Sequence, residues 1–275
     1  MNQSEATTRD RLRKFSNSFT FAKVLGDNPD LCKQVIERIL GVEIKDLVMV
    51  SAEETFSLIE EKGIRCDILA SDSDTYYEVE MQAYSDSDLD RRMQYYESAI
   101  TMRSARKYMA YAEIPPRVLI MICNYDHYKG GLSYYSFSMR CNEAYEIVQD
   151  RGTVTIVINA SVIDPNLLED LVKFIRYVQN NEVDQSDKLV CDLDSAIDEA
   201  IRDESWVSFV NNIEREMINR EYQSKREGRI EGRIEGRIEE INKLVTDGIL
   251  SPEQGAERIE SIKAEALEAR VEICG

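Results

Sequence analysis

Histidine is almost absent from this chain of 275 residues, which contains only His127. A single histidine excludes zinc sites built from several histidines. It also makes a Ser-His-Asp or Cys-His catalytic centre improbable, because everything would depend on one residue in the loop-like stretch NYDHYKGG. We therefore expect any hydrolytic chemistry to use carboxylates, amides and lysines around a hard metal ion.

Long apolar runs and paired cysteines are also missing. No uninterrupted apolar stretch approaches the roughly 18 residues of a membrane span, and the N-terminal segment MNQSEATTRDRLRKF lacks the apolar core of a signal peptide. No two cysteines form a CxxC pair. We expect no membrane partner, and we expect reduced, mostly buried thiols in a cytoplasmic protein at Cys32, Cys66, Cys123, Cys141, Cys191 and Cys274.

Basic residues are the minority among the charges, with 34 Lys and Arg against 52 Asp and Glu and a net charge of −18. This balance argues against simple nucleic-acid binding, which needs clustered Lys and Arg. The distribution is uneven, however. Residues 1–25 hold five basic and two acidic side chains, residues 91–140 hold eight and three, and residues 51–90 hold two and twelve. Net charge therefore does not decide the question.

The pattern of apolar residues predicts an α/β core. Helices are expected over residues 19–27, 28–41, 86–112, 166–180 and 193–222, the second with Asn28 as cap, Pro29 in its first turn and Gly41 at its end. Strand-like segments are expected over residues 45–54, 56–72, 75–84, 115–125, 132–140 and 153–160. The nearly continuous apolar run RVLIMIC is typical of a strand in the middle of a sheet.

The tail breaks this pattern with the repeat EGRI, which predicts three parts: a core domain over residues 1–220, a helical tail over 221–245 and a small helical element over 246–275. The isoleucines of the repeat share one helical face, although its glycines each cost a helix about 1 kcal/mol relative to alanine. Glutamates four residues apart also repel. The tail is therefore either a frayed, solvated helix or a helix that packs on a partner, and we expect the same segment of a second copy, giving a homodimer.

Carboxylates gather on the predicted hairpin RCDILASDSDTYYEVEMQ. Residues two apart share a face of a strand, so Glu78, Glu80 and Gln82 point one way, and Asp67 on the preceding strand can reach them. Two carboxylates with carbonyls and water form the oxygen-rich environment that Mg²⁺ prefers. A metal there would support phosphodiester hydrolysis without histidine. The alternative is an ordinary amphipathic hairpin with an acidic outer face.

The order of these motifs resembles the PD-(D/E)XK nuclease superfamily. The match is closest to the branch described as recombination-promoting nucleases (Rpn) or PD-(D/E)XK transposases. It rests on Asp67, the run VEMQ ending at Gln82, Arg91 or Arg92 before the pair YY, the strand RVLIMIC and the tail EGRIEGRIEGRI.

This resemblance implies a restriction-endonuclease-like fold and a metal-dependent DNA endonuclease linked to recombination, mobile elements or defence. It implies Mg²⁺ as cofactor, with Mn²⁺ as a substitute, and Asp67 and Glu80 as metal ligands. Gln82 completes the catalytic set in place of the usual lysine, a neutral residue that cannot titrate. The competing function is a weak or inactive nuclease-fold protein that oligomerises through its C-terminal helix.

Five flanking residues have two interpretations each. Glu78 is either an extra ligand or a solvated neighbour. Arg91 and Arg92 either contact DNA phosphates and balance the acidic site, or form structural salt bridges. Glu53 and Glu54 are expected to be surface residues rather than catalytic ones.

Overall fold

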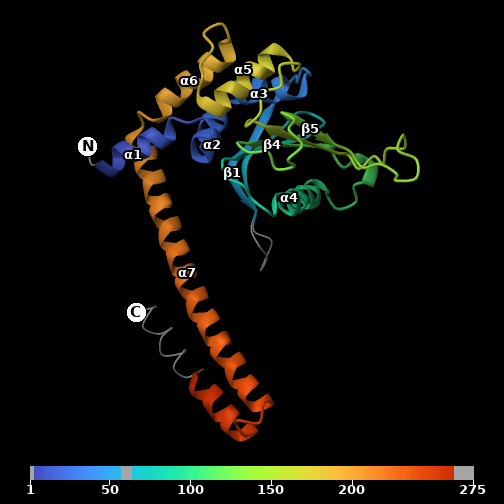
Figure 1. Cartoon of the computed structure of the whole chain (residues 1–275). Helices are drawn as coiled ribbons and strands as arrows, with labels where there is room; N and C mark the ends of the chain where they lie inside the picture. The colour runs from blue at the N-terminus through green and yellow to red at the C-terminus, as the bar shows by residue number, and fades with distance from the viewer. Residues whose placement is uncertain (1–2, 57–63, 263–275) are drawn as a thin grey trace. The chain divides into compact units, whose positions relative to one another are not determined.

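The computed structural model of the chain describes residues 3–56 and 64–262 (Figure 1). The chain divides into two compact units, residues 1–208 and residues 209–275. The first unit holds a mixed β-sheet with flanking helices, and the second is helical. This confirms the predicted α/β core and the C-terminal helix. Among the described residues, no helix combines the length and apolar character that a bilayer crossing requires.

Six strands form one sheet in the order β1-β2-β3-β4-β6-β5. Strands β3, β4 and β6 pair in parallel, whereas β1, β2 and β5 each run antiparallel to their neighbours. The last five residues of β4 are buried, which confirms the prediction of a central strand. The strands are β1 (Val48–Phe56), β2 (Ile64–Ser71), β3 (Tyr76–Gln82), β4 (Arg117–Cys123), β5 (Tyr134–Phe137) and β6 (Thr153–Asn159).

Helices of the first unit cover both faces of this sheet. Figure 1 shows α3, α5 and α6 on one side and α4 on the other. Helix α2 packs against β1, β2 and β3. The helices are α1 (Gln3–Leu12), α2 (Ser18–Asp27), α3 (Pro29–Leu40), α4 (Leu89–Ser104), α5 (Glu169–Asn180) and α6 (Lys188–Ala200), with a short 3₁₀ helix η1 (Tyr111–Glu113).

The boundaries of α2 and α3 follow local signals in the sequence. The Asn17 side chain accepts hydrogen bonds from the N–H groups of Phe19 and Thr20, which caps α2. Pro29 occupies the first turn of α3, and Gly41 ends it with φ 67° and an N–H that donates to the Glu37 carbonyl. Asn28 precedes α3 as predicted, but its side chain donates to the Val24 carbonyl instead of capping.

Helix α4 is shorter than predicted, since it ends at Ser104 and not at residue 112. Beyond Ile100 the segment offers no buried apolar side chain before η1, so further helical turns would gain no packing energy. Tyr108, within the predicted helix, has φ 74° and is 91% exposed. The sequence pattern also did not predict α1.

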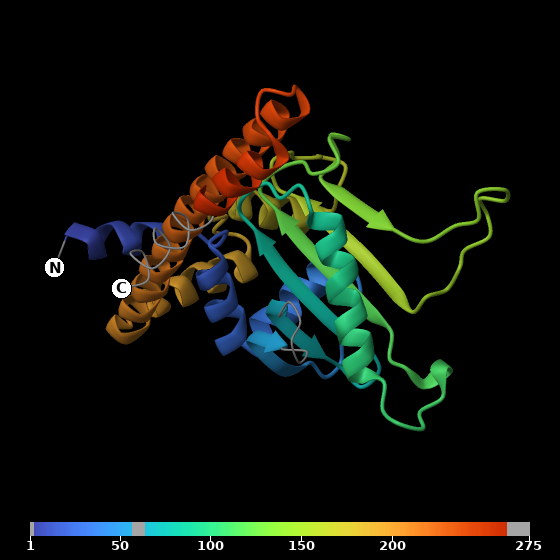
Figure 2. The ribbon, with the colours of Figure 1, turned by 90° about the horizontal axis from the view of Figure 1, so that it is seen from below.

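The side of the sheet that faces α4 carries the acidic residues of β3. Glu78 and Glu80 pair in register with Leu119 and Met121 of β4, and these two residues pack with Leu89 of α4. Paired residues of neighbouring strands point to the same face. The carboxylates therefore lie beneath α4, which Figure 2 shows crossing the sheet while β5 and β6 extend past it.

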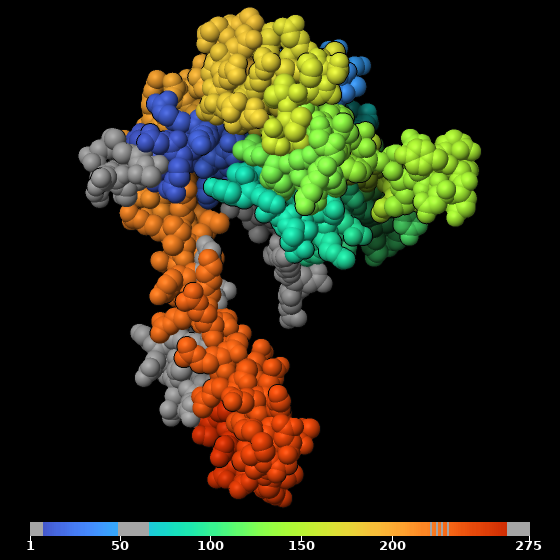
Figure 3. All heavy atoms as spheres, viewed as in Figure 1, coloured from blue at the N-terminus to red at the C-terminus, as the bar shows by residue number. Residues whose placement is uncertain are grey.

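The segment between β5 and β6, residues 138–152, leaves the sheet as a projecting arm (Figure 3). A single bridge joins Arg140 and Val148 across it. Of the predicted strand over residues 132–140, only Tyr134–Phe137 pairs with β6.

The second unit is a helical hairpin. Helix α7 (Glu204–Thr246) runs without a break through the EGRI repeat, a turn with Gly248 at φ 70° follows, and residues 252–262 form the second helix. Ser251 caps that helix: its Oγ accepts from the Gln254 N–H while the Gln254 side chain accepts from the Ser251 N–H. The side chain of Ile241 is buried in this unit, as is that of Ile262.

Candidate functional site

Asp67 and Glu80 replace part of the backbone pairing between β2 and β3. The regular ladder covers Ile68–Ser71 against residues 76–79. Next to it, the Asp67 N–H donates to Glu80 Oε1 at 2.8 Å, and the Met81 N–H donates to Asp67 Oδ2 at 2.9 Å. Each carboxylate is thus held by the partner strand's backbone, a charge-assisted bond that fixes both side chains in the space between the two strands.

Burial of these residues excludes an acidic outer face on the hairpin. Asp67, Glu78 and Glu80 are 8%, 3% and 2% exposed. Glu78 is therefore not a solvated neighbour, which corrects that interpretation of the sequence. The side chains of Glu53 and Glu54 lie outside the described part of the structure.

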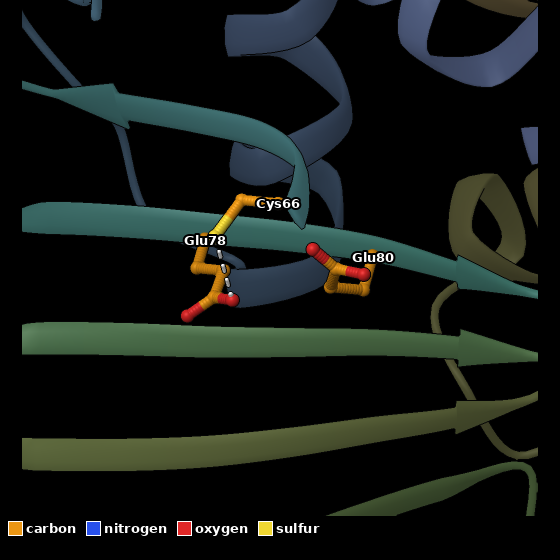
Figure 4. Close-up of side chains that lie close together, drawn as sticks. All are labelled: Cys66, Glu78 and Glu80. Carbon is orange, nitrogen blue, oxygen red and sulfur yellow. Dashed lines mark hydrogen bonds between the residues drawn. The ribbon is translucent and has the colours of Figure 1, made fainter. Parts of the chain in front are cut away.

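Cys66 joins the two glutamates in a compact cluster (Figure 4). Its thiol donates to Glu78 Oε1 at 3.3 Å, and one ligand atom each from Cys66, Glu78 and Glu80 lie within 4.8 Å of one another. Figure 4 shows Cys66 reaching from β2 toward Glu78 of β3. The sequence pattern did not place Cys66 in this site.

A break in strand alternation brings Cys66 to this face. Cys66 and Leu69, three residues apart on β2, both pack with Ala99 and Ile100 of α4. Strict alternation would point them to opposite faces. The irregularity lies between Cys66 and Leu69, where Asp67 forms hydrogen bonds with Glu80 and Met81 of β3. The spacing of residues in the sequence does not predict it.

Buried carboxyl groups crowd together at the site. Burial raises the pKa of Glu80 well above its usual range, and the charges of Asp67 and Glu78 add to the rise. Burial also raises the pKa of Glu78 to about 8, with contributions from Glu97 and Asp67. Because opposite charge nearby favours ionised carboxylates, this cluster would be stabilised by a cation.

Arg92 is the cation that the structure brings to the cluster. Its field lowers the pKa of both Glu78 and Glu80, although burial outweighs it. Arg92 Nη1 lies 3.0 Å from Asp86 Oδ2, and its guanidinium lies 5.8 Å from the centre of the Tyr96 ring. The Arg92 Nε is buried without a hydrogen-bond partner. Arg91 is exposed.

Gln82 is the last residue of β3, two positions after Glu80 and on the same face. It is half-buried, and its backbone carbonyl accepts from the Asn124 N–H at 3.0 Å. Its side-chain amide makes no hydrogen bond with the described residues, so it is available to a ligand at the edge of the site.

The donor set fits a hard divalent cation. Carboxylate oxygens from Asp67, Glu78 and Glu80 are ligands that Mg²⁺ and Mn²⁺ prefer. The thiol of Cys66 is a soft donor only when ionised, and burial followed by the charges of Glu78 and Glu80 raises its pKa. In the metal-free protein Cys66 is therefore a neutral hydrogen-bond donor to Glu78, and the carboxylate oxygens are the hard donor atoms of the cluster.

Glu97 is a second residue that sequence reasoning missed. It lies on α4, its charge raises the pKa of Glu78, and its Oε1 accepts from Thr155 Oγ1 at 2.8 Å. The contact joins a helix to a strand 58 positions along the chain. Only the fold reveals such an arrangement.

The cysteines carry no disulfide among the described residues. Cys32, Cys66 and Cys123 are buried, and Cys141 and Cys191 are half-buried. Cys274 lies outside the described residues. The expectation of free, mostly buried thiols is confirmed for these five.

Comparison with known proteins agrees with this geometry. A family model described as PD-(D/E)XK nuclease family transposase matches residues 16–231, from the segment before α2 into the EGRI repeat of α7. Neither the curated proteins nor the solved structures contain a significant match. The matched span exceeds half of the chain and includes the whole sheet, so the α/β core is of the restriction-endonuclease-like kind. The chain belongs to the PD-(D/E)XK nuclease family transposases.

Proposed function

We propose that the chain is a divalent-metal-dependent DNA endonuclease that hydrolyses phosphodiester bonds. The observation that carries this proposal is the pair formed by Asp67 and Glu80, buried and held by each other's strands. Membership of a nuclease family supports DNA as the substrate. A role in recombination, mobile elements or defence is proposed from the same membership.

Asp67 and Glu80 are proposed to hold Mg²⁺, with Mn²⁺ as a substitute, and Glu78 to contribute a third carboxylate oxygen. Such an ion, when bound, polarises a phosphoryl oxygen and lowers the pKa of a bound water. Within the protein, the bonds from the backbones of Asp67 and Met81 orient the two main carboxylates. The thiol of Cys66 fixes the position of Glu78.

Gln82 and Arg92 are proposed to act on substrate and water. The Gln82 amide can donate to a phosphate oxygen or accept from the attacking water, but it cannot take up a proton. Arg92 provides positive charge beside the carboxylates, and its unpartnered Nε is a donor ready for a phosphate oxygen. Arg91, exposed on the same helix, is proposed to contact the DNA backbone.

Plasmid nicking with Mg²⁺ tests the proposal. Asp67→Asn and Glu80→Gln should each abolish nicking, because they remove ligand charge at nearly constant shape, and chelation of the metal should do the same to the wild type. Asp74→Asn is the matched control, since Asp74 is an exposed carboxylate in the turn of the same hairpin. Nicking by the Asp67→Asn, Glu80→Gln double variant at the wild-type rate would refute the assignment.

A second candidate function is a weakly active or inactive protein that keeps the fold and oligomerises through α7. Neutral Gln82 in place of lysine favours it, as do the exposed apolar side chains of Met217, Ile218 and Tyr222 on α7. Self-association through α7 is proposed in either case. Wild-type protein that folds, oligomerises and leaves plasmid intact with Mg²⁺ or Mn²⁺ would favour this candidate.

A further inference from the structure

The first unit contains a pocket of about 570 Å³ whose lining includes none of Asp67, Glu78 and Glu80. It is bounded by the starts of β4 and β6, the end of β5, the arm (residues 138–152) and Glu97 of α4. This volume is in the range of small-molecule sites. The residues that decide its chemistry are Arg117, Arg151, Phe137, Met139 and Val148.

Arg117 is a half-buried cation, and two of its three guanidinium nitrogens have no hydrogen-bond partner. Its Nη2 donates to Thr153 Oγ1 at 2.9 Å, while Nε and Nη1 are buried and make no hydrogen bond. No carboxylate of the described residues lies within ion-pair distance of this guanidinium. Buried donors without acceptors are costly and rare in proteins. We therefore expect the Nε and Nη1 groups of Arg117 to donate to an acceptor on a bound ligand.

Arg151 places a second guanidinium at the same pocket. Burial is the main cause that lowers the pKa of Arg117. The charge of Glu97 raises this pKa, that of Arg151 lowers it, and that of Glu78 raises it. Glu97 Oε1 is engaged by Thr155, and Asp150, also in the lining, accepts from the Gly152 N–H. Two neighbouring guanidiniums form the donor pattern that recognises phosphate.

An apolar wall faces these cations. Phe137 is 41% exposed and packs on the Tyr128 ring at 4.8 Å between ring centres, so it forms a rigid platform. Met139 and Val148 extend the wall and are also exposed. A planar aromatic surface beside positive charge is the combination that binds one nucleotide of a single strand, with the base stacked and the phosphate paired.

The position along the sheet links the pocket to the proposed active site. Arg117 pairs in register with Tyr76, and Glu78 follows two residues later on β3. Two residues of a strand span about 7 Å. A DNA strand held at Arg117 can therefore extend along the sheet toward the carboxylates.

We propose that this pocket anchors one nucleotide unit of the DNA strand, its phosphate on Arg117 and Arg151 and its base against Phe137. The proposal rests on the proposed function, because it takes the occupant to be part of the substrate. Anchoring outside the carboxylate cluster would also explain how a chain of net charge −18 holds DNA.

Binding of a fluorescein-labelled single-stranded oligonucleotide tests this, measured by anisotropy on the full chain without divalent metal, so that nothing is cleaved. Arg117→Met and Arg151→Gln should each weaken binding about tenfold or more. Each should reduce the slope of log affinity against log salt by about 0.7, the value for one phosphate contact on a single strand. Arg176→Met on α5, at the opposite face, is the control and should bind like the wild type.

Thermal unfolding of the ligand-free variants separates binding from structure. If Arg117 serves a ligand, Arg117→Met removes a half-buried guanidinium with two unpaired nitrogens, and the Tm should stay equal or rise. A lower Tm together with unchanged affinity would overturn the proposal, as would affinity loss no greater than that of Arg176→Met. Arg151 is exposed, so Arg151→Gln gives a readout even if the first variant does not fold.

Two further measurements distinguish a failure of the pocket proposal from a failure of the proposed function. Thymidine 5′-phosphate should bind far more weakly than the oligonucleotide, and equal affinity that depends on Arg117 would mean a free-nucleotide site and refute strand anchoring. Wild-type protein that binds and cleaves DNA, with Arg117 and Arg151 variants that behave identically, would refute only the pocket. A wild type that neither binds nor cleaves DNA would refute both proposals.

Discussion

Burial makes the carboxyl group of Glu78 costly to ionise. Burial raises its pKa to about 8, against an ordinary value of 4.5. A carboxyl whose pKa is higher in the folded state contributes stability that is complete below about pH 4.5 and is lost as the pH rises through 8. Metal-free protein should therefore lose stability over this range.

The Glu78→Gln variant tests that pH dependence. We expect a Tm a few degrees higher than the wild type at pH 8.5 without metal, and little difference at pH 4.5, because glutamine keeps an oxygen for the Cys66 thiol and has no charge to bury. Glu146→Gln, at an exposed position of the arm, is the control. An equal gain at both pH values would mean that Glu78 does not titrate over this range.

Gln82 is the residue whose chemistry departs from the usual lysine of the superfamily. If its amide holds water or phosphate, Gln82→Ala should lower the nicking rate about a hundredfold, as for the loss of one positioned donor. Gln82→Lys should preserve or increase the rate, because it adds positive charge beside developing negative charge. Single-turnover rates with Mg²⁺ measure both. Equal rates for all three proteins would remove Gln82 from the site.

At the scale of elements, regular patterns were predictable and local irregularities were not. Alternation along β3 placed Glu78, Glu80 and Gln82 on one face, and the structure agrees. The break in alternation at β2 that brings Cys66 to the same face has no sequence signal, because it depends on the sideways bonds of Asp67.

Helix ends follow the same rule. Gly41 ends α3 as predicted, and Ser251 begins the last described helix, because in each case a single residue supplies the cap. The end of α4 at Ser104 was not predictable from caps. It depends on where the apolar surface of the sheet stops supporting the helix, and this is a property of the packed molecule.

The glycines of the C-terminal hairpin have opposite roles that substitution can separate. A Cβ at Gly255 would lie 2.5 Å from Val245 Cγ2, so Gly255→Ala should push the two helices apart. A Cβ at Gly236 meets nothing within 4 Å, and Gly236→Ala should stabilise α7 by about 1 kcal/mol. Amide hydrogen exchange over residues 241–262 should rise in the first variant and fall or stay equal in the second. Faster exchange in both would contradict this distinction.

At the scale of the whole molecule, the proposed dimer depends on which surface covers the isoleucines of α7. Ile241 packs within the chain's own hairpin, whereas Ile234 and Ile238 are only half-buried among the described residues, and the side chain of Ile230 lies outside them. The glycines and the like-charged spacings leave a solitary helix marginal. A second copy of α7 can cover the remaining apolar positions and pair Glu with Arg between chains.

Truncation after Tyr222 should therefore yield a monomer that keeps the fold of residues 1–208 and its nicking activity but loses double-strand cutting, because two sites in one two-fold particle are needed to cut both strands together. Sedimentation measures the assembly, and the ratio of linear to nicked plasmid measures the cutting. Met217→Gln with Ile218→Gln on the full chain is a companion variant that should weaken the dimer without removing the tail. A full-length protein that sediments as a monomer at micromolar concentration, or a truncated one that remains a dimer, would show that α7 does not hold the copies together.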